Sequence, residues 1–116
     1  MTPLRILVVE DDPVIGMLLG EMLEEMGHRV CAIAANETSA VSAAAEHSPD
    51  LMIVDASLGA GCGLAAVDAA CLGGPRRHLF VSGDAERVRS SRPGAVVLQK
   101  PYDEAALARG IAQASA

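Results

Sequence analysis

The sequence predicts one α/β domain built on a parallel sheet of five strands. Five short apolar runs, rich in β-branched residues, recur along the chain and are typical of strands buried on both faces of a sheet. Segments with helical patterning alternate with the first of these runs, which indicates parallel strands joined by crossovers. The 116 residues fit one domain, which is large enough to bury a core without disulfides or structural metals.

The first strand and the first helix are marked most clearly. Residues 5–9 read R-I-L-V-V and end at an acidic turn. Pro13 suits the first position of a helix with Asp12 as its N-cap. Apolar residues then recur at helical spacing until Gly27, so a strand, an acidic turn and a helix are expected in this order.

The remaining elements follow the same logic, with Pro-, Gly- and Ser-rich breaks between them. Strands are expected over residues 30–34, 51–54, 79–81 and 96–98. Helices are expected over residues 37–47, over 64–70 after a loop with three glycines, and from an N-cap at Asp103 through about residue 113.

Composition excludes several classes of function. Nine Lys and Arg residues against 15 Asp and Glu give a net charge of −6, which argues against a nucleic-acid partner. One Tyr, one Phe and no Trp leave little for stacking on bases, flavins or nicotinamides. No apolar run approaches the roughly 18 to 20 residues that span a bilayer, so no membrane partner is expected.

The cysteines and the start of the chain indicate the compartment. Cys31, Cys62 and Cys71 are odd in number and have no CxxC spacing, and they are expected to be unpaired. The first ten residues have neither the basic nor the long apolar region of a signal peptide. A cytoplasmic protein is therefore expected.

Polar side chains stand where the predicted strands end. The carboxyl ends of parallel strands meet at one edge of the sheet, where ligands bind in such folds. The first strand ends in three acids, the third in an acid, the fourth in a hydroxyl residue and the fifth in a lysine. These residues are Glu10, Asp11 and Asp12, then Asp55, Ser82 and Lys100.

This set of side chains predicts phosphate chemistry with a metal ion. Crowded carboxylates repel one another unless a cation neutralises them, and oxygen ligands suit Mg²⁺, which also binds phosphate oxygens. Asp55 can then act as a nucleophile toward phosphorus, while Lys100 offsets charge on the transferred group. Ser82 can donate a hydrogen bond to a phosphoryl oxygen.

Together these motifs resemble the response-regulator receiver domain (CheY-like) of two-component signalling, from residue 5 to about 113. They read I-L-V-V-E-D-D-P, I-V-D-A-S-L-G-A-G-C-G, F-V-S-G and Q-K-P. The resemblance implies a flavodoxin-like sheet in the order 2-1-3-4-5 with helices on both faces. We also expect one receiver domain over residues 1–116, without an effector domain, and the resemblance implies a signalling protein rather than an enzyme.

The resemblance assigns roles around the metal. Asp55 is expected to accept a phosphoryl group from a phosphohistidine, on a histidine kinase or a histidine phosphotransfer protein. Asp11 is expected to bind Mg²⁺ directly and Glu10 through water, with Mn²⁺ as a substitute ion. The backbone carbonyl of Ser57 would complete the protein ligands together with Asp55.

Two further residues are expected to contact the phosphoryl group. Ser82 takes the place of the hydroxyl residue that follows this group, and Lys100 precedes what is often a cis proline, Pro101. Output is expected through protein contact or onward phosphoryl transfer, and a phosphate sink and a relay carrier stay open.

The chain also departs from the usual receiver pattern. Val97 stands where the family usually has Tyr or Phe, three residues before the lysine. Lys100 lies 18 positions after Ser82, about one helical turn fewer than usual, so the fourth helix is expected to be short or missing. Both features look like a variant group of stand-alone bacterial receivers with a Phe-Ala-Thr-Gly-Tyr-type motif, which residues 80–84 match in part.

Three other functions share some of these features. A haloacid-dehalogenase-like phosphatase wants a second Asp two residues after the nucleophile, where this chain has Ser57. A flavodoxin-like FMN site needs a first loop rich in hydroxyls or glycines, and an acidic loop repels phosphate. A pseudo-receiver that binds partners without phosphorylation is the remaining alternative, because the aromatic residue is absent.

Overall fold

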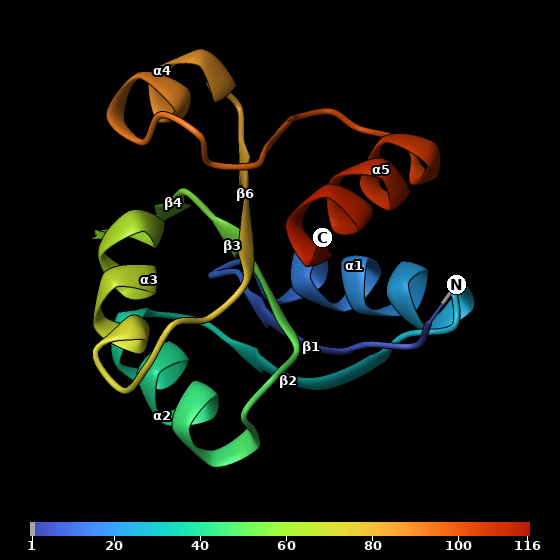
Figure 1. Cartoon of the computed structure of the whole chain (residues 1–116), viewed down its shortest axis with the longest axis horizontal. Coiled ribbons are helices and arrows are strands. Elements are labelled where there is room, and N and C mark those ends of the chain that lie inside the picture. The colour runs from blue at the N-terminus through green and yellow to red at the C-terminus, as the bar shows by residue number, and fades with distance from the viewer. Residues whose placement is uncertain (1) are drawn as a thin grey trace.

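The computed structural model describes residues 2–116 and has the predicted parallel sheet (Figure 1). Its five strands lie in the order β2-β1-β3-β6-β7, and every neighbouring pair is parallel. Because β4 and β5 belong to a separate small sheet, this order is the predicted 2-1-3-4-5. The strands are β1 (Arg5–Val9), β2 (Arg29–Ala34), β3 (Leu51–Asp55), β6 (His78–Ser82) and β7 (Val97–Gln99).

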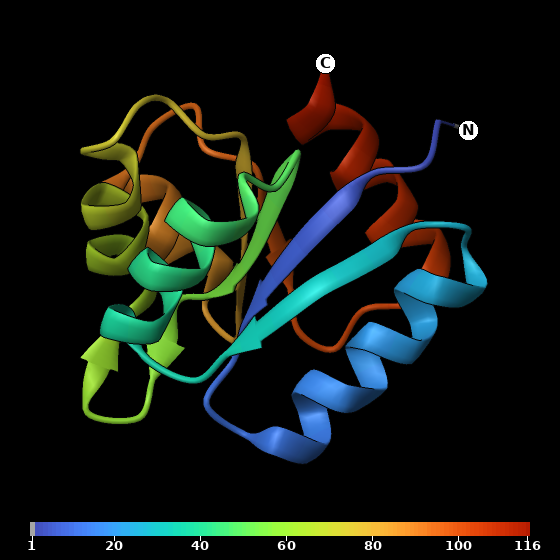
Figure 2. The ribbon, with the colours of Figure 1, turned by 90° about the horizontal axis from the view of Figure 1, so that it is seen from below.

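Five helices cover both faces of the sheet (Figure 2). Side chains alternate between the faces along each strand, so Ile6 and Val8 pack with α1 and α5, while Leu7 and Val9 pack with α2, α3 and α4. The residues inside each central strand are therefore apolar on both faces, and polar residues stand at the strand ends. The helices are α1 (Pro13–Glu25), α2 (Glu37–His47), α3 (Gly63–Cys71), α4 (Ala85–Ser91) and α5 (Glu104–Ser115).

Local sequence explains where the helices begin. Asp12 caps α1 by accepting hydrogen bonds from the amides of Val14 and Ile15, as predicted. Asn36 and Ser39 form a reciprocal capping box at the start of α2. None of the helices in the described chain is both long and apolar enough to cross a membrane.

The structure corrects some boundaries. The predicted strand over residues 96–98 lies one residue later, because Val97 is the residue that pairs with Phe80. The fourth helix, expected to be short or missing, is short, with seven residues, as predicted. The loop with three glycines contains an unpredicted antiparallel pair, β4 (Ser57–Leu58) and β5 (Gly61–Cys62). Two-residue strands are too short to give a period-2 pattern in the sequence.

Candidate functional site

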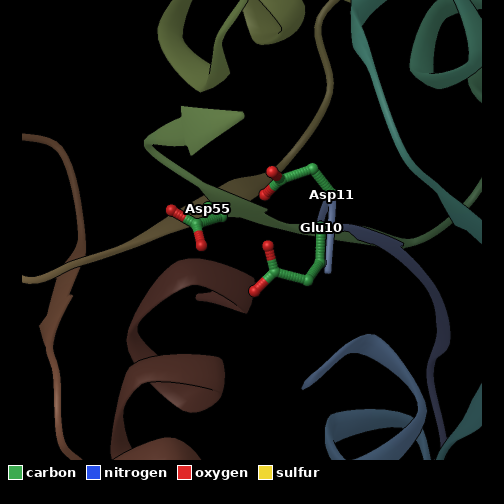
Figure 3. Close-up of side chains that lie close together, drawn as sticks. All are labelled: Glu10, Asp11 and Asp55. Atoms are coloured by element: carbon green, nitrogen blue, oxygen red, sulfur yellow. The ribbon is translucent and has the colours of Figure 1, made fainter. Parts of the chain in front are cut away.

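Three carboxylates meet at the carboxyl edge of the sheet (Figure 3). Glu10 and Asp11 directly follow β1, and Asp55 is the last residue of β3. One oxygen from each lies within 4.8 Å of the others. Glu10 and Asp55 are only 5% and 8% exposed, whereas Asp11 lies at the surface. The predicted cluster of acids is thus present, with two of its members buried.

Strand pairing accounts for this convergence. β1 and β3 are adjacent and in register, with Val9 opposite Val54, so the residues that follow them are neighbours. The amide of Glu10 donates to the carbonyl of Ala34 at 2.9 Å, which extends the pairing with β2 to the site. The backbone that carries the acids is therefore fixed by the central strands.

Burial and like charge act together on Glu10. Burial raises its pKa from an ordinary 4.5 to about 7, with added effects from the charge and hydrogen bonding of Asp55 and from Asp11. Lys100 opposes the increase without cancelling it. One carboxyl oxygen of Glu10, Oε2, is buried without a hydrogen-bond partner among the described residues. The charged form of Glu10 is therefore disfavoured in the protein alone.

Lys100 is paired with Asp55. Its Nζ lies 2.6 Å from Asp55 Oδ2, and both side chains are partly or largely shielded from solvent. Burial alone would lower the pKa of Lys100, but the hydrogen bond and charge of Asp55, with the charge of Glu10, raise it overall. The amide of Lys100 donates to the carbonyl of Ser82 at 2.8 Å, which fixes the lysine beside the fourth parallel strand.

The two serines of the prediction flank Asp55. The Ser57 amide donates to Asp55 Oδ1 at 2.9 Å. Ser82 is buried at the end of β6, whose neighbouring residue Val81 pairs with Asp55. Its Oγ accepts a hydrogen bond from the Asp84 amide at 2.9 Å, which leaves the hydroxyl proton free to be donated. Ser57 and Ser82 line the same groove beside the acids.

Two glycines let the loop after β3 close around the acids. A Cβ on Gly63 would lie 2.0 Å from the carbonyl oxygen of Asp55, so only glycine fits at the start of α3. Gly59 has a φ of 59°, and a Cβ there would lie 3.1 Å from Asp11 Oδ2. Close backbone approach therefore shapes the site.

Tyr102 is a site residue that the sequence analysis missed. It lines a small cavity with Glu10, Asp55 and Lys100. Burial raises the pKa of its phenol, with Lys100 acting in the opposite direction. The only available signal was its position directly after Lys100 and Pro101, whose shared peptide bond is cis. Asp12, by contrast, is outside the acidic cluster and serves as a helix cap.

The acidic cluster fits a hard divalent cation. Carboxylate oxygens are the ligands that Mg²⁺ prefers, and such an ion is usually held by few carboxylates with water completing the octahedron. The buried, unpartnered oxygen of Glu10 and the proximity of Asp11 and Asp55 supply unneutralised donors of this type. Lys100 compensates only one of the three negative charges when all three acids are ionised.

Comparison with known proteins identifies the family. The family model described as the response regulator receiver domain matches residues 6–112. The phyllosphere-induced regulator PhyR of Methylorubrum extorquens is 34% identical over 114 residues, which cover 95% of this chain and 43% of the relative. The chain thus spans less than half of this relative.

Solved structures agree. The PhyR receiver domain of Erythrobacter litoralis superposes with a TM-score of 0.87 at 29% identity, covering 98% of this chain and 91% of that one. The anti-anti-sigma factor PhyR of Bartonella quintana gives a TM-score of 0.89 at 25% identity, covering 98% of this chain and 48% of the other. With a matching family model and a matching fold, the chain belongs to the response regulator receiver domain family of two-component signalling proteins.

Proposed function

We propose that Asp55 is a phosphoacceptor that takes a phosphoryl group from a phosphohistidine. The observation that carries this proposal is the buried Asp55 carboxylate, with the Lys100 ammonium 2.6 Å away and two further acids within 4.8 Å. Mg²⁺ would be held by Glu10, Asp11 and Asp55, with the Ser57 carbonyl as the fourth protein ligand, and Mn²⁺ would substitute. The bound ion would offset negative charge on the transferring phosphoryl oxygens.

The chain's own groups supply the remaining chemistry. A carboxylate oxygen of Asp55 attacks phosphorus, an O–P bond forms, the P–N bond of phosphohistidine breaks, and the imidazole leaves. After the transfer, Lys100 would bind a phosphoryl oxygen instead of the Asp55 carboxylate that it contacts in the unmodified protein. The Ser57 amide and the Ser82 hydroxyl are donors on the same side of the site. These donors stabilise the charge that the phosphoryl group brings.

The donor would be a histidine kinase or a histidine phosphotransfer protein, and the output would be protein contact or onward transfer. The printed description "anti-anti-sigma factor" belongs to a PhyR protein of which this chain covers 48%. That description refers to the whole PhyR protein, of which this chain matches one part. For this chain, an anti-sigma factor is one candidate downstream partner.

A second candidate function is partner binding without phosphorylation, and Val97 favours it. This residue stands in place of the usual aromatic and is packed, half-buried, against the hydrophobic core on the α2–α3–α4 face. Valine has no aromatic ring that could rotate when Asp55 is phosphorylated. The intact set of acids and Lys100 supports phosphorylation as the primary function.

Intact-mass spectrometry tests the proposal. Incubation with acetyl phosphate and Mg²⁺ should add one phosphoryl group, and EDTA or Asp55→Asn should prevent it. Asp12→Asn is the matched control, because asparagine keeps the helix cap and the residue lies outside the cluster. Undiminished labelling of Asp55→Asn would refute the site. Absence of labelling by both acetyl phosphate and phosphorylated histidine kinases would favour the second function.

A further inference from the structure

Gln99 makes three hydrogen bonds with its side chain beside the candidate phosphoacceptor site. Its Oε1 accepts from the amide of Ala85 at 2.9 Å. Its Nε2 donates to the carbonyl of Gly83 at 2.7 Å and to the carbonyl of Lys100 at 2.8 Å. One amide side chain thus joins the end of β7 to the segment between β6 and α4.

The segment that Gln99 holds carries the Ser82 hydroxyl. Gly83 and Asp84 form the turn after Ser82, and the Asp84 amide donates to Ser82 Oγ at 2.9 Å. The backbone of Lys100 is hydrogen-bonded to Ser82 in the strand pairing. Gln99 therefore lies between the two groups, Ser82 and Lys100, that are expected to contact the phosphoryl group.

We propose that Gln99 is a positioning residue that holds the Ser82 hydroxyl and the Lys100 backbone in the arrangement needed for phosphoryl uptake. This inference rests on the proposed phosphoacceptor function of Asp55. Gln99 acts through its neighbours and not on the phosphoryl group itself, since its side chain is engaged with backbone groups. Pre-organised donors lower the barrier because they need no rearrangement as charge develops.

Contacts other than those of Gln99 already hold α4 in place. The far end of α4 is held by Arg92, which pairs with Asp68 at 2.6 Å, and by Arg89, which donates to the Val97 carbonyl at 3.2 Å. The helix is also capped by Asp84. Removing the Gln99 amide should leave α4 in place and loosen only the turn after Ser82.

Gln99→Met tests the inference, because methionine has nearly the same length and makes none of the three hydrogen bonds. With saturating Mg²⁺, its phosphorylation by acetyl phosphate should be about tenfold slower than that of the wild type. Gln113→Met is the matched control. Gln113, the only other glutamine, is exposed on α5, and no hydrogen bond of its side chain is present among the described residues. This control should react at the wild-type rate.

The dependence on Ser82 separates positioning from a structural effect. In a Ser82→Ala background, Gln99→Met should slow uptake by about threefold or less instead of about tenfold, because the hydroxyl is gone and only the Lys100 backbone is left to be positioned. Mg²⁺ affinity, titrated without phosphodonor, should not change in Gln99→Met, since the three acids are untouched. An equal slowing in both backgrounds, or a loss of Mg²⁺ affinity, would overturn the inference.

A second variant keeps the test valid if Gln99→Met does not fold. Gln99→Glu retains the acceptor for the Ala85 amide, but it loses both donors and places a carboxylate oxygen against the carbonyls of Gly83 and Lys100, so its uptake should also be slower than that of the wild type. A wild-type rate in Gln99→Glu would refute positioning through Gly83 and Lys100. If the wild type itself takes up no phosphoryl group from acetyl phosphate or kinase, the proposed function fails and the inference with it. If the wild type is phosphorylated and the Gln99 variants are phosphorylated at the same rate, the inference about Gln99 is refuted and the proposed function of Asp55 stands.

Discussion

Buried polar groups at the two edges of the sheet differ in their hydrogen bonding and in the charges around them. At the carboxyl edge, Glu10 Oε2 is buried without a hydrogen-bond partner among residues 2–116, next to a second buried acid. At the amino edge, His28 is also buried with one unpartnered nitrogen, Nε2, but its Nδ1 accepts from the Leu4 amide at 3.1 Å. Glu10 is surrounded by like charge. His28 is instead buried in its neutral form, and its hydrogen bond with Leu4 connects the start of β2 to the start of β1.

The surroundings reinforce this contrast. At the amino edge, Asp50 accepts from the Arg5 amide at 2.8 Å, and the Arg5 guanidinium donates to the Ser48 carbonyl at 3.2 Å. Both of these charged groups therefore have a local backbone partner. At the carboxyl edge the acids face one another, which costs stability and persists where a ligand or a reaction needs it. Unsatisfied charge thus separates the functional edge from the structural one.

The largest expected effect is that of Gly63→Ala at the carboxyl edge. The added Cβ would lie 2.0 Å from the Asp55 carbonyl oxygen, so the start of α3 or the end of β3 must move. We expect the free energy of unfolding to fall by about 3 kcal/mol or more. Chemical denaturation measures it. Gly73→Ala, at the amino edge, where a Cβ meets nothing within 4 Å, should change stability by less than about 1 kcal/mol. Equal effects of the two variants would contradict the close approach described for Gly63.

Glu10→Gln sharpens the comparison through charge. Removing a carboxylate whose pKa is raised should stabilise the metal-free protein above neutral pH by about 1 to 3 kcal/mol. The same change should weaken Mg²⁺ binding, because one negative donor is lost. Thermal unfolding in EDTA and in Mg²⁺ measures both effects. If Glu10→Gln were less stable than the wild type in EDTA, the acids would not repel one another in the metal-free protein.

His28 gives the smallest effect and a pH dependence with a defined sign. Burial lowers its pKa below the ordinary 6.5, so the unfolded chain takes up a proton at a higher pH than the folded chain does. The stability from neutral His28 is therefore present above about pH 7 and is lost as the pH falls through 6.5 toward the folded-state value.

Denaturation of the wild type and of His28→Gln at a series of pH values tests this sign. Between about pH 7.5 and pH 5.5 the protonation of Glu10 stabilises both proteins, and we expect the wild type to gain less stability than His28→Gln, because only the wild type loses the contribution of neutral His28. His47→Gln, which removes a partly exposed ring, is the control and should keep the wild-type slope. A wild-type slope in His28→Gln would exclude His28 as its source.

Much of the candidate site was predictable because strand ends are predictable. Once β1 and β3 are recognised as apolar runs, parallel pairing brings Glu10, Asp11 and Asp55 together, and the structure shows this convergence. Lys100 and Ser82 follow from the same geometry on β7 and β6. Their chemical roles stay predictions until phosphorylation is measured.

The contacts that sequence reasoning missed are those set by side-chain direction across loops. Gln99 lies just after the predicted strand over residues 96–98, in the Q-K-P motif, and only the folded turn shows its three hydrogen bonds. The β4–β5 pair is likewise invisible, although Glu37 holds it by accepting from the Cys62 amide at 3.0 Å. No periodicity encodes a contact between a helix start and a loop 25 residues later.

The place of Tyr102 gives the molecule an optical property. The chain has one tyrosine and no tryptophan, so one phenol accounts for nearly all of its near-ultraviolet absorption and its intrinsic fluorescence. That phenol lines the cavity of Glu10, Asp55 and Lys100. We therefore expect a change of charge there to alter the optical signal of the unlabelled protein, so that titration of the site could be followed spectroscopically without attaching a dye.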